Sequence, residues 1–340
     1  MPAPASGSAA EEKHLLEEFT TYDQHVDVVS ALEWLFTWGK GIQDTVVRFE
    51  RFPRIKVEGK TYTPDFTVLF TDGTAIVGEI AKMELHDNSV DKLCSQIGHY
   101  ADFDHVPDAR GRLVPVQHVD VVLLVDMDIG LAAVRRIIRE RFASLDHPYS
   151  PAESPCIVQF VRRESHYSFQ RLQGPDNGVL HAGDRVPHIG GYLDEGLSIR
   201  AAHFVAIKSR RGFINDPIKP LYLATHLWTR TWRNAFGGGS TDITVEEQAT
   251  ATRFQGEYGI GGVTVVREAL ALLECAGLAA SQGGGTWLVS RKSLGRTGDN
   301  ELPKRSPGVR PRSAHPLWFS GHRVARRWRW TPSSSPCRRL

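Results

Sequence analysis

Two short apolar runs on either side of a tight turn form the clearest pattern of hydrophobic and polar positions along the chain. They cover residues 62–68 and 76–82, and Asp72-Gly73 lies between them. Apolar and β-branched residues favour strands, and Asp-Gly is a strong hairpin sequence. The pattern therefore predicts two antiparallel strands, the first carrying Asp65 and the second carrying Glu79.

The flanking sequence predicts further strands and helices on both sides of this hairpin. Apolar positions at helical spacing predict helices over residues 27–38, 87–102 and 131–142. A strand pair is expected over 46–57, and the nearly continuous apolar run 119–126 is typical of a buried central strand. Helices and strands that alternate in this way predict an α/β fold, with a mixed sheet flanked by helices. This domain is expected to end at residue 142 of the chain.

Asp65 and Glu79 are candidate metal ligands. Across a hairpin the two side chains are expected to lie side by side, where two anions repel unless a cation joins them. Mg²⁺ suits such a pair, because it prefers carboxylate and water ligands and completes its shell with phosphate oxygens of a substrate. We therefore predict a Mg²⁺ site, with Mn²⁺ as a substitute metal.

Pro64-Asp65 followed by Glu79 resembles the core motif of the PD-(D/E)xK nuclease superfamily, which has Pro-Asp on one strand and an acid, a spacer and Lys on the next. The resemblance implies a restriction-endonuclease-like sheet and metal-dependent hydrolysis of DNA. The family lysine falls at Ala81, and Lys82 comes one residue later, where a regular strand points it to the other face. Three alternatives stay open: a bulge that turns Lys82 inward, a cation supplied from elsewhere, or an inactive site.

The predicted helix 87–102 carries three polar residues that share one face. Lys92, Gln96 and Tyr100 follow one another at intervals of four residues. Nucleases of the RecB-like branch carry a similar Gln-x-x-x-Tyr helix after the catalytic strand. The resemblance implies that Gln96 and Tyr100 orient the phosphate backbone of the substrate, and it makes Lys92 a candidate for the missing catalytic lysine. The alternative is the polar face of an ordinary amphipathic helix.

Glu33 borders the apolar side of the predicted helix 27–38. Many members of the superfamily use a carboxylate from such a helix as a further metal ligand, so the resemblance nominates Glu33 for that role. Glu17, Glu18 and Glu50 compete with it, and a solvated helix acid is the alternative without a function.

The order of predicted elements over residues 28–126 resembles that of the TnsA-type endonuclease subunit of transposons, which also has a C-terminal winged-helix domain. The resemblance implies DNA as a partner, together with a transposase or another mobile-element protein. It leaves a homodimer open and gives no membrane partner.

A second pattern, over residues 220–292, resembles a winged-helix domain. Three helices are expected over 221–236, 244–254 and 263–276, and a Gly-rich hairpin is expected over 278–289. The third helix of such domains often enters the major groove of DNA. The alternative is a winged helix that contacts proteins.

Two further expectations depend on side chains of this domain. Thr244 and Glu247 match the capping-box pattern at the start of the second helix. Thr264, Arg267 and Glu268 are expected to point outward from the third helix, so Arg267 is the candidate DNA-binding residue of this domain. The exposed face is otherwise poor in Lys and Arg.

The remaining segments are less informative. Residues 143–155 are expected to form a linker, and 156–219 a middle segment of unassigned role, with strands over 156–169 and 202–208. Residues 293–340 form a tail in which, from Arg296 onward, 11 Lys and Arg stand against two acids. This composition predicts a disordered, phosphate-binding segment, and a sequence translated out of frame is the competing explanation.

Bulk properties predict a protein of the cytoplasm. The formal net charge is +2, and the four cysteines contain no Cys-x-x-Cys pair, which disfavours a zinc ribbon and a disulfide framework. No signal-peptide pattern and no apolar stretch of about 20 residues is present, so no membrane span is predicted.

Taken together, these features predict a Mg²⁺-dependent DNA endonuclease of a mobile element or of a defence system. One alternative is a catalytically inactive DNA-binding or assembly subunit that keeps the nuclease fold. The other is a transcription regulator in which the winged helix binds DNA.

Overall fold

The computed structural model describes most of the chain between residues 9 and 291. The described residues are 9–57, 59–81, 87–127, 140, 155–172, 177–183, 189–206, 212–214, 217–236, 241–259 and 261–291. The chain divides into two compact units, which we describe separately. The sheet unit comprises His25–Arg210, and the helical unit comprises Met1–Gln24 together with Arg211–Leu340.

The sheet unit is mixed α/β and is built on a seven-stranded sheet with the order β1-β4-β5-β8-β9-β10-β11. The strands are β1 (Val46–Arg51), β4 (Phe66–Phe70), β5 (Thr74–Ile80), β8 (His118–Asp126), β9 (Cys156–Arg162), β10 (His166–Arg171) and β11 (Leu197–Arg200). β5, β8 and β9 are parallel, and the other neighbouring pairs are antiparallel. The predicted hairpin β4–β5 and the buried central strand β8 are therefore confirmed.

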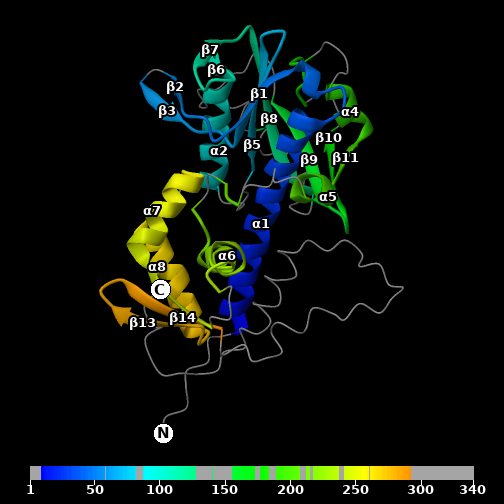
Figure 1. Cartoon of the computed structure of the whole chain (residues 1–340). Helices are drawn as coiled ribbons and strands as arrows, with labels where there is room; N and C mark the ends of the chain where they lie inside the picture. Colours follow the sequence, from blue (N-terminus) through cyan, green and yellow to red (C-terminus); the bar gives the residue numbers. More distant parts are fainter. Residues whose placement is uncertain are drawn as a thin grey trace. The chain divides into compact units, whose positions relative to one another are not determined.

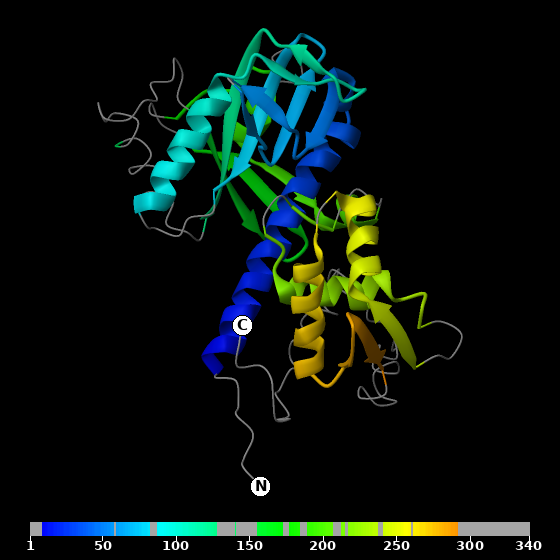
Figure 2. The same cartoon turned by 90° about the vertical axis from the view of Figure 1, so that its left-hand side faces the viewer.

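Helices cover both faces of this sheet. The long helix α1 (Ala9–Trp38) contributes its second part, residues 25–38, to one face, and α2 (Asp87–Ala101) covers the other (Figures 1 and 2). The division follows from strand alternation, because successive side chains point to opposite faces. On β5, Val77 packs in the core cluster with Ile97 of α2, whereas Ile76 faces the α1 side.

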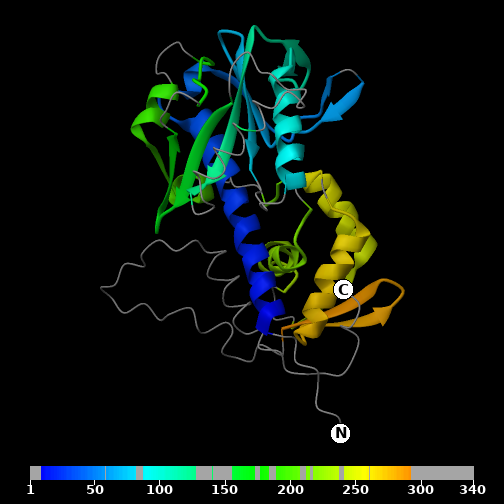
Figure 3. The same cartoon turned by 180° about the vertical axis from the view of Figure 1, so that it is seen from behind.

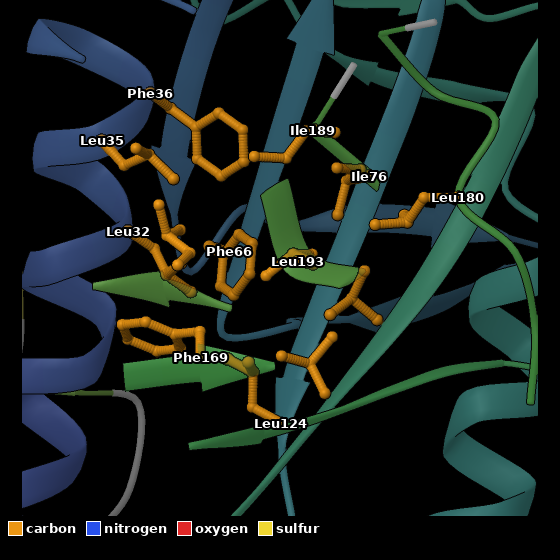
Figure 4. Close-up of a pocket in the computed structure, with 13 residues that line it drawn as sticks. Leu32, Leu35, Phe36, Phe66, Ile76, Leu124, Phe169, Leu180, Ile189 and Leu193 are labelled. Atoms are coloured by element: carbon orange, nitrogen blue, oxygen red, sulfur yellow. The ribbon is translucent and has the colours of Figure 1, made fainter. Parts of the chain in front are cut away.

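An apolar cavity marks the core on the α1 side of the sheet (Figure 4). Its lining combines Leu32 and Phe36 of α1 with Phe66 and Leu124 of the sheet and Leu193 of the short helix α4 (Ile189–Glu195). Every lining side chain is apolar, so the cavity offers no group that would bind an anionic substrate. The candidate chemistry lies on the other face.

Two small hairpins and two short helices also belong to the described part of the sheet unit. They are η1 (Gln43–Thr45), β2 (Ile55–Val57), β3 (Lys60–Tyr62), β6 (His105–Pro107), β7 (Leu113–Pro115) and α5 (Ala201–Ala206). β2 pairs with β3 and β6 pairs with β7. Two strands form over 46–57 as expected, β1 and β2. Their expected pairing is wrong, because β1 pairs with β4 while β2 pairs with β3.

The segment after residue 155 joins the same sheet. The strands expected over 156–169 are confirmed as β9 and β10, and β11 follows at the sheet edge. The strand expected over 202–208 is wrong, since residues 201–206 form α5. The sheet therefore continues beyond residue 142, the predicted end of the domain. The predicted helix 131–142, the linker and the basic tail lie outside the described residues, apart from Glu140 and Pro155.

The helical unit contains helices and a three-stranded sheet with the order β12-β14-β13. Its elements after residue 211 are α6 (Pro220–His226), the π-helical turn η3 (Leu227–Thr231), β12 (Asp242–Glu246), α7 (Glu247–Tyr258), α8 (Val263–Cys275), β13 (Ala279–Gly283) and β14 (Thr286–Ser290). The third predicted helix and the hairpin are confirmed. The helix expected over 221–236 instead ends in the π-helical turn.

The predicted capping box at Thr244 is wrong. Thr244 lies in β12, opposite Leu288 of β14, and α7 begins only at Glu247. The β-branched neighbours Ile243 and Val245 favour a strand there. Pairing with β14 therefore outweighs the local helix-start pattern.

Among the described residues, no helix combines the length and apolar character that crossing a membrane requires. Cys94 and Cys156 are buried free thiols.

Gly78 is required by the packing between β4 and β5. A Cβ atom at this position would lie 2.0 Å from Cζ of Phe66, the residue that pairs with Gly78 across the hairpin. The ring of Phe66 therefore fills the space that a side chain would need. Because Phe66 follows Asp65 and Gly78 precedes Glu79, this contact also fixes the backbone next to both carboxylates.

Replacement of Gly78 by Ala is expected to destabilise the protein by about 1–3 kcal/mol, because the Phe66 ring must move within a packed core. Urea denaturation measures the loss. Gly191→Ala is the matched control, since a Cβ at that helical glycine meets nothing within 4 Å. Equal stability of wild type and Gly78→Ala would contradict this account of the packing.

Candidate functional site

Strand register brings Asp65 and Glu79 opposite each other. Phe66 pairs with Gly78, so the next position outward on each strand is Asp65 and Glu79. The backbone N–H of Ile80 donates to Oδ2 of Asp65 at 2.8 Å, which ties the Asp65 side chain across to β5. Asp65 and Glu79 are only 3% and 8% exposed. The two carboxylates thus form a buried acidic pair at one end of the hairpin.

Helix α2 contributes two donors to Glu79. The hydroxyl of Tyr100 donates to Oε2 of Glu79 at 3.1 Å, and Nε2 of Gln96 donates to Oε1 at 3.1 Å. The same Gln96 nitrogen also donates to the Tyr100 oxygen at 2.5 Å. Gln96 and Tyr100 therefore meet one member of the acidic pair, on the face of α2 that their spacing predicts.

Tyr100 is held in its protonated form. Burial raises the pKa of Tyr100 far above its ordinary value, and the nearby charges of Glu79 and Asp65 raise it further, although the hydrogen bond from Gln96 acts in the opposite direction. A neutral phenol keeps its proton, so Tyr100 is a permanent donor to Glu79 at any physiological pH. This contact fixes the orientation of the carboxylate.

Glu33 is engaged by an arginine that sequence patterns did not single out. Nε of Arg51 donates to Oε2 of Glu33 at 2.6 Å, and its NH2 group donates to Oγ of Ser30 at 2.9 Å. The Arg51 side chain is only 2% exposed. Arg51 is the last residue of β1, where an arginine is normally a solvated surface residue. Its burial depends on α1 packing over the strand, and no local pattern signals it.

The Arg51–Glu33 pair is joined to the acidic pair through the backbone. Arg51 pairs with Phe66 in the sheet, and the N–H of the next residue, Phe52, donates to the carbonyl oxygen of Asp65 at 3.2 Å. Phe52 has a φ of 51°, the one positive value among the described non-glycine residues. Strained backbone of this kind is often found at functional sites.

The lysine candidates have different outcomes. Lys82 lies outside the described residues, so the predicted bulge stays a prediction. Lys92 is exposed on α2, one turn before Gln96. Ala81, at the family lysine position, is buried, and its N–H donates to the Leu124 carbonyl oxygen at 2.8 Å. The strand is therefore regular up to Ala81, whose methyl group belongs to the core cluster on the α2 side.

The acidic pair offers the oxygen ligands that Mg²⁺ prefers, but it consists of only two residues. Both residues supply carboxylate oxygens, the ligand type that Mg²⁺ prefers. No group of three or more His, Cys, Asp or Glu that could hold a metal forms within the part of the chain that the structure describes. The residues present thus fit a metal held by two carboxylates and water. Glu33 as a third ligand stays a prediction.

Arg267, the predicted DNA-binding residue of the helical unit, is engaged by a buried acid. Its Nε and NH2 groups donate to Oε2 of Glu247 at 3.0 and 2.8 Å, and Nε1 of Trp287 donates to Oε1 at 2.9 Å. Glu247 is 5% exposed. One carboxylate therefore joins α7, α8 and β14, and the Arg267 guanidinium already has a partner.

Comparisons with family models, curated proteins and solved structures found no match to this chain.

The Glu247 cluster makes the stability of the helical unit depend on pH. The hydrogen bonds from Arg267, followed by that from Trp287, hold the pKa of Glu247 below its ordinary value of 4.5. A carboxyl group with a lowered folded-state pKa contributes stability above 4.5 and loses it as the pH falls through the folded-state value.

Glu247→Gln is expected to lower the free energy of unfolding by roughly 1–2 kcal/mol at neutral pH, because charge-assisted hydrogen bonds are lost. Urea denaturation as a function of pH should show the gap between wild type and variant closing below pH 4.5. Glu246→Gln, at the exposed preceding residue, is the control. A gap that stays constant on acidification would contradict this role.

Proposed function

We propose that the chain is a metal-dependent DNA endonuclease with a restriction-endonuclease-like sheet unit and a winged-helix domain within its helical unit. The observation that carries the proposal is the contact of Glu79 with Gln96 and Tyr100, beside Asp65. Four residues nominated by resemblance to nucleases thus share one face of the sheet. A metal ion bound between the two buried carboxylates would lower the repulsion between them.

The chemistry follows from what these residues can hold. Asp65 and Glu79 would hold Mg²⁺, which when bound neutralises charge on the scissile phosphate and lowers the pKa of the attacking water. Tyr100 and Gln96 keep the Glu79 carboxylate in one orientation. Lys82 or Lys92 would face the negative charge that develops on the phosphate. Glu33, which α1 carries and Arg51 holds, stays a predicted third ligand.

The order of elements supports the winged-helix part of the proposal. The sequence α6, β12, α7, α8, β13, β14 with sheet order β12-β14-β13 matches that of a winged helix. DNA binding through α8 has weaker support, since Arg267 is paired with Glu247. The resemblance to the TnsA-type subunit extends the proposal to a mobile element, with a transposase as a partner.

The second candidate is a catalytically inactive subunit that binds DNA or assembles with other proteins. The buried methyl group of Ala81, at the family lysine position, favours it. Under this alternative the acidic pair still binds a metal or a partner but supports no cleavage. A regulator that acts through the winged helix alone has no specific observation in its favour.

Asp65→Asn and Glu79→Gln are each expected to lower Mg²⁺-dependent plasmid nicking by at least about a hundredfold, because each removes charge that holds the metal. Both changes are nearly isosteric, so folding should persist, and thermal melts check this. Asp102→Asn, at an exposed position just after α2, is the matched control and should nick at the wild-type rate.

The same assay separates the two candidates. Equal nicking by wild type and both variants would end the endonuclease assignment at this site. No nicking by any protein, with Mg²⁺ or Mn²⁺ and with partner proteins present, would favour the inactive subunit.

A further inference from the structure

The hairpin β2–β3 carries basic side chains and lies just before Asp65 in the chain. It lies in the chain between Arg51 of β1 and Asp65. Three cations, Arg54, Lys56 and Lys60, are exposed on or beside it. No ion pair or side-chain hydrogen bond joins any of the three to another described residue, whereas Arg48 and Arg112 elsewhere in the unit are paired with acids.

Packing fixes the hairpin on the α2 side of the sheet. Ile55 is 1% exposed and belongs to the core cluster that contains Tyr100. Tyr62 lies against α2, with its ring centroid 4.8 Å from that of His99, and it contacts Phe103 as well. In Figures 1 and 3 the hairpin extends from the sheet beside α2. The hairpin therefore lies on the side of the sheet that carries Asp65 and Glu79. Its register pairs Lys56 with Thr61 and Lys60 with Val57, so Lys56 and Lys60 project from opposite faces of the hairpin.

Chain connectivity limits how far Lys60, the last of the three cations, lies from Asp65. Lys60 precedes Asp65 by five residues, so their Cα atoms are at most about 18 Å apart. Successive base pairs of a duplex rise about 3.4 Å, so this distance covers about five base pairs. A duplex whose phosphate lies at the acidic pair would pass the hairpin within that length.

We propose that Arg54, Lys56 and Lys60, which are distributed over both faces of the hairpin, form a phosphate-binding surface that holds the DNA backbone next to the Asp65–Glu79 pair. Unpaired exposed cations are the groups that neutralise phosphates, and such contacts position a nucleic acid without reading its sequence. The surface also offsets the repulsion between two buried carboxylates and an anionic substrate. This inference rests on the proposed function for its orientation, although its test measures binding alone. Glu58 lies outside the described residues.

The test compares two triple variants of the full chain with the same change in charge. The first replaces Arg54, Lys56 and Lys60 by Gln. The control replaces Lys40, Arg163 and Arg200 by Gln, three exposed residues on other elements of the same unit. Fluorescence anisotropy with a duplex of about 30 base pairs, in EDTA and over a range of salt concentrations, gives the affinity and its salt dependence.

Three lost phosphate contacts should reduce the slope of log affinity against log salt by about 2.7, because each contributes about 0.9. We expect affinity to fall at least about tenfold for the hairpin variant and to change little for the control. Equal changes in the two variants, or no binding by wild type, would overturn the proposal. So would competition by a polyglutamate peptide as strong as that by DNA, which would point to an acidic protein partner.

Binding and nicking separate this inference from the proposed function. A hairpin-dependent salt slope without nicking supports the surface and removes the endonuclease assignment. Nicking with a slope that does not depend on the hairpin overturns the surface and leaves the endonuclease in place.

Discussion

The placement of two carboxylates at adjacent cross-strand positions is the constraint on which the rest of the site depends. Asp65 and Glu79 are both nearly buried, and burial makes the repulsion between them stronger than it would be in water. Each is compensated by donors: the Ile80 N–H for Asp65, and Gln96 and Tyr100 for Glu79. These described donors are neutral, and they orient the two carboxylates. A metal ion at the pair would lower the repulsion between them, and this is the physical basis of the proposed metal site.

Neighbouring structure acts mainly to keep this pair in place. The Phe66 ring over Gly78 fixes the strand pair one residue inside the carboxylates. The buried Arg51, paired with Glu33, fixes the end of β1, and Phe52 then turns the chain toward the basic hairpin. A single stretch of chain therefore links the arginine, the hairpin cations and Asp65. Such continuity lets local packing determine where a substrate phosphate would lie relative to the pair.

Local patterns predicted the parts of the fold that local sequence controls. Asp72-Gly73 between apolar runs predicted the β4–β5 hairpin, and four-residue spacing predicted that Gln96 and Tyr100 share a face of α2. The burial of Arg51 could not be predicted, because it arises from tertiary packing against α1, where its partner Glu33 lies 18 residues earlier in the chain. The capping box predicted at Thr244 was wrong for a similar reason, since pairing of β12 with β14 outweighed the helix-start pattern. The place of β9, β10 and β11 in the sheet likewise depends on tertiary pairing, of β9 with β8 and of each later strand with the one before it. Periodicity within each strand does not reveal these partners.

The central claim is that the Asp65–Glu79 pair holds a metal ion. Its most direct test is the anomalous scattering of crystals soaked in Mn²⁺, with Asp65→Asn crystals as the reference. We expect a peak at about 2.1 Å from a carboxylate oxygen of each residue, and its loss in the variant. An ordered acidic pair without a peak, or Mn²⁺ bound only by other residues, would contradict the account.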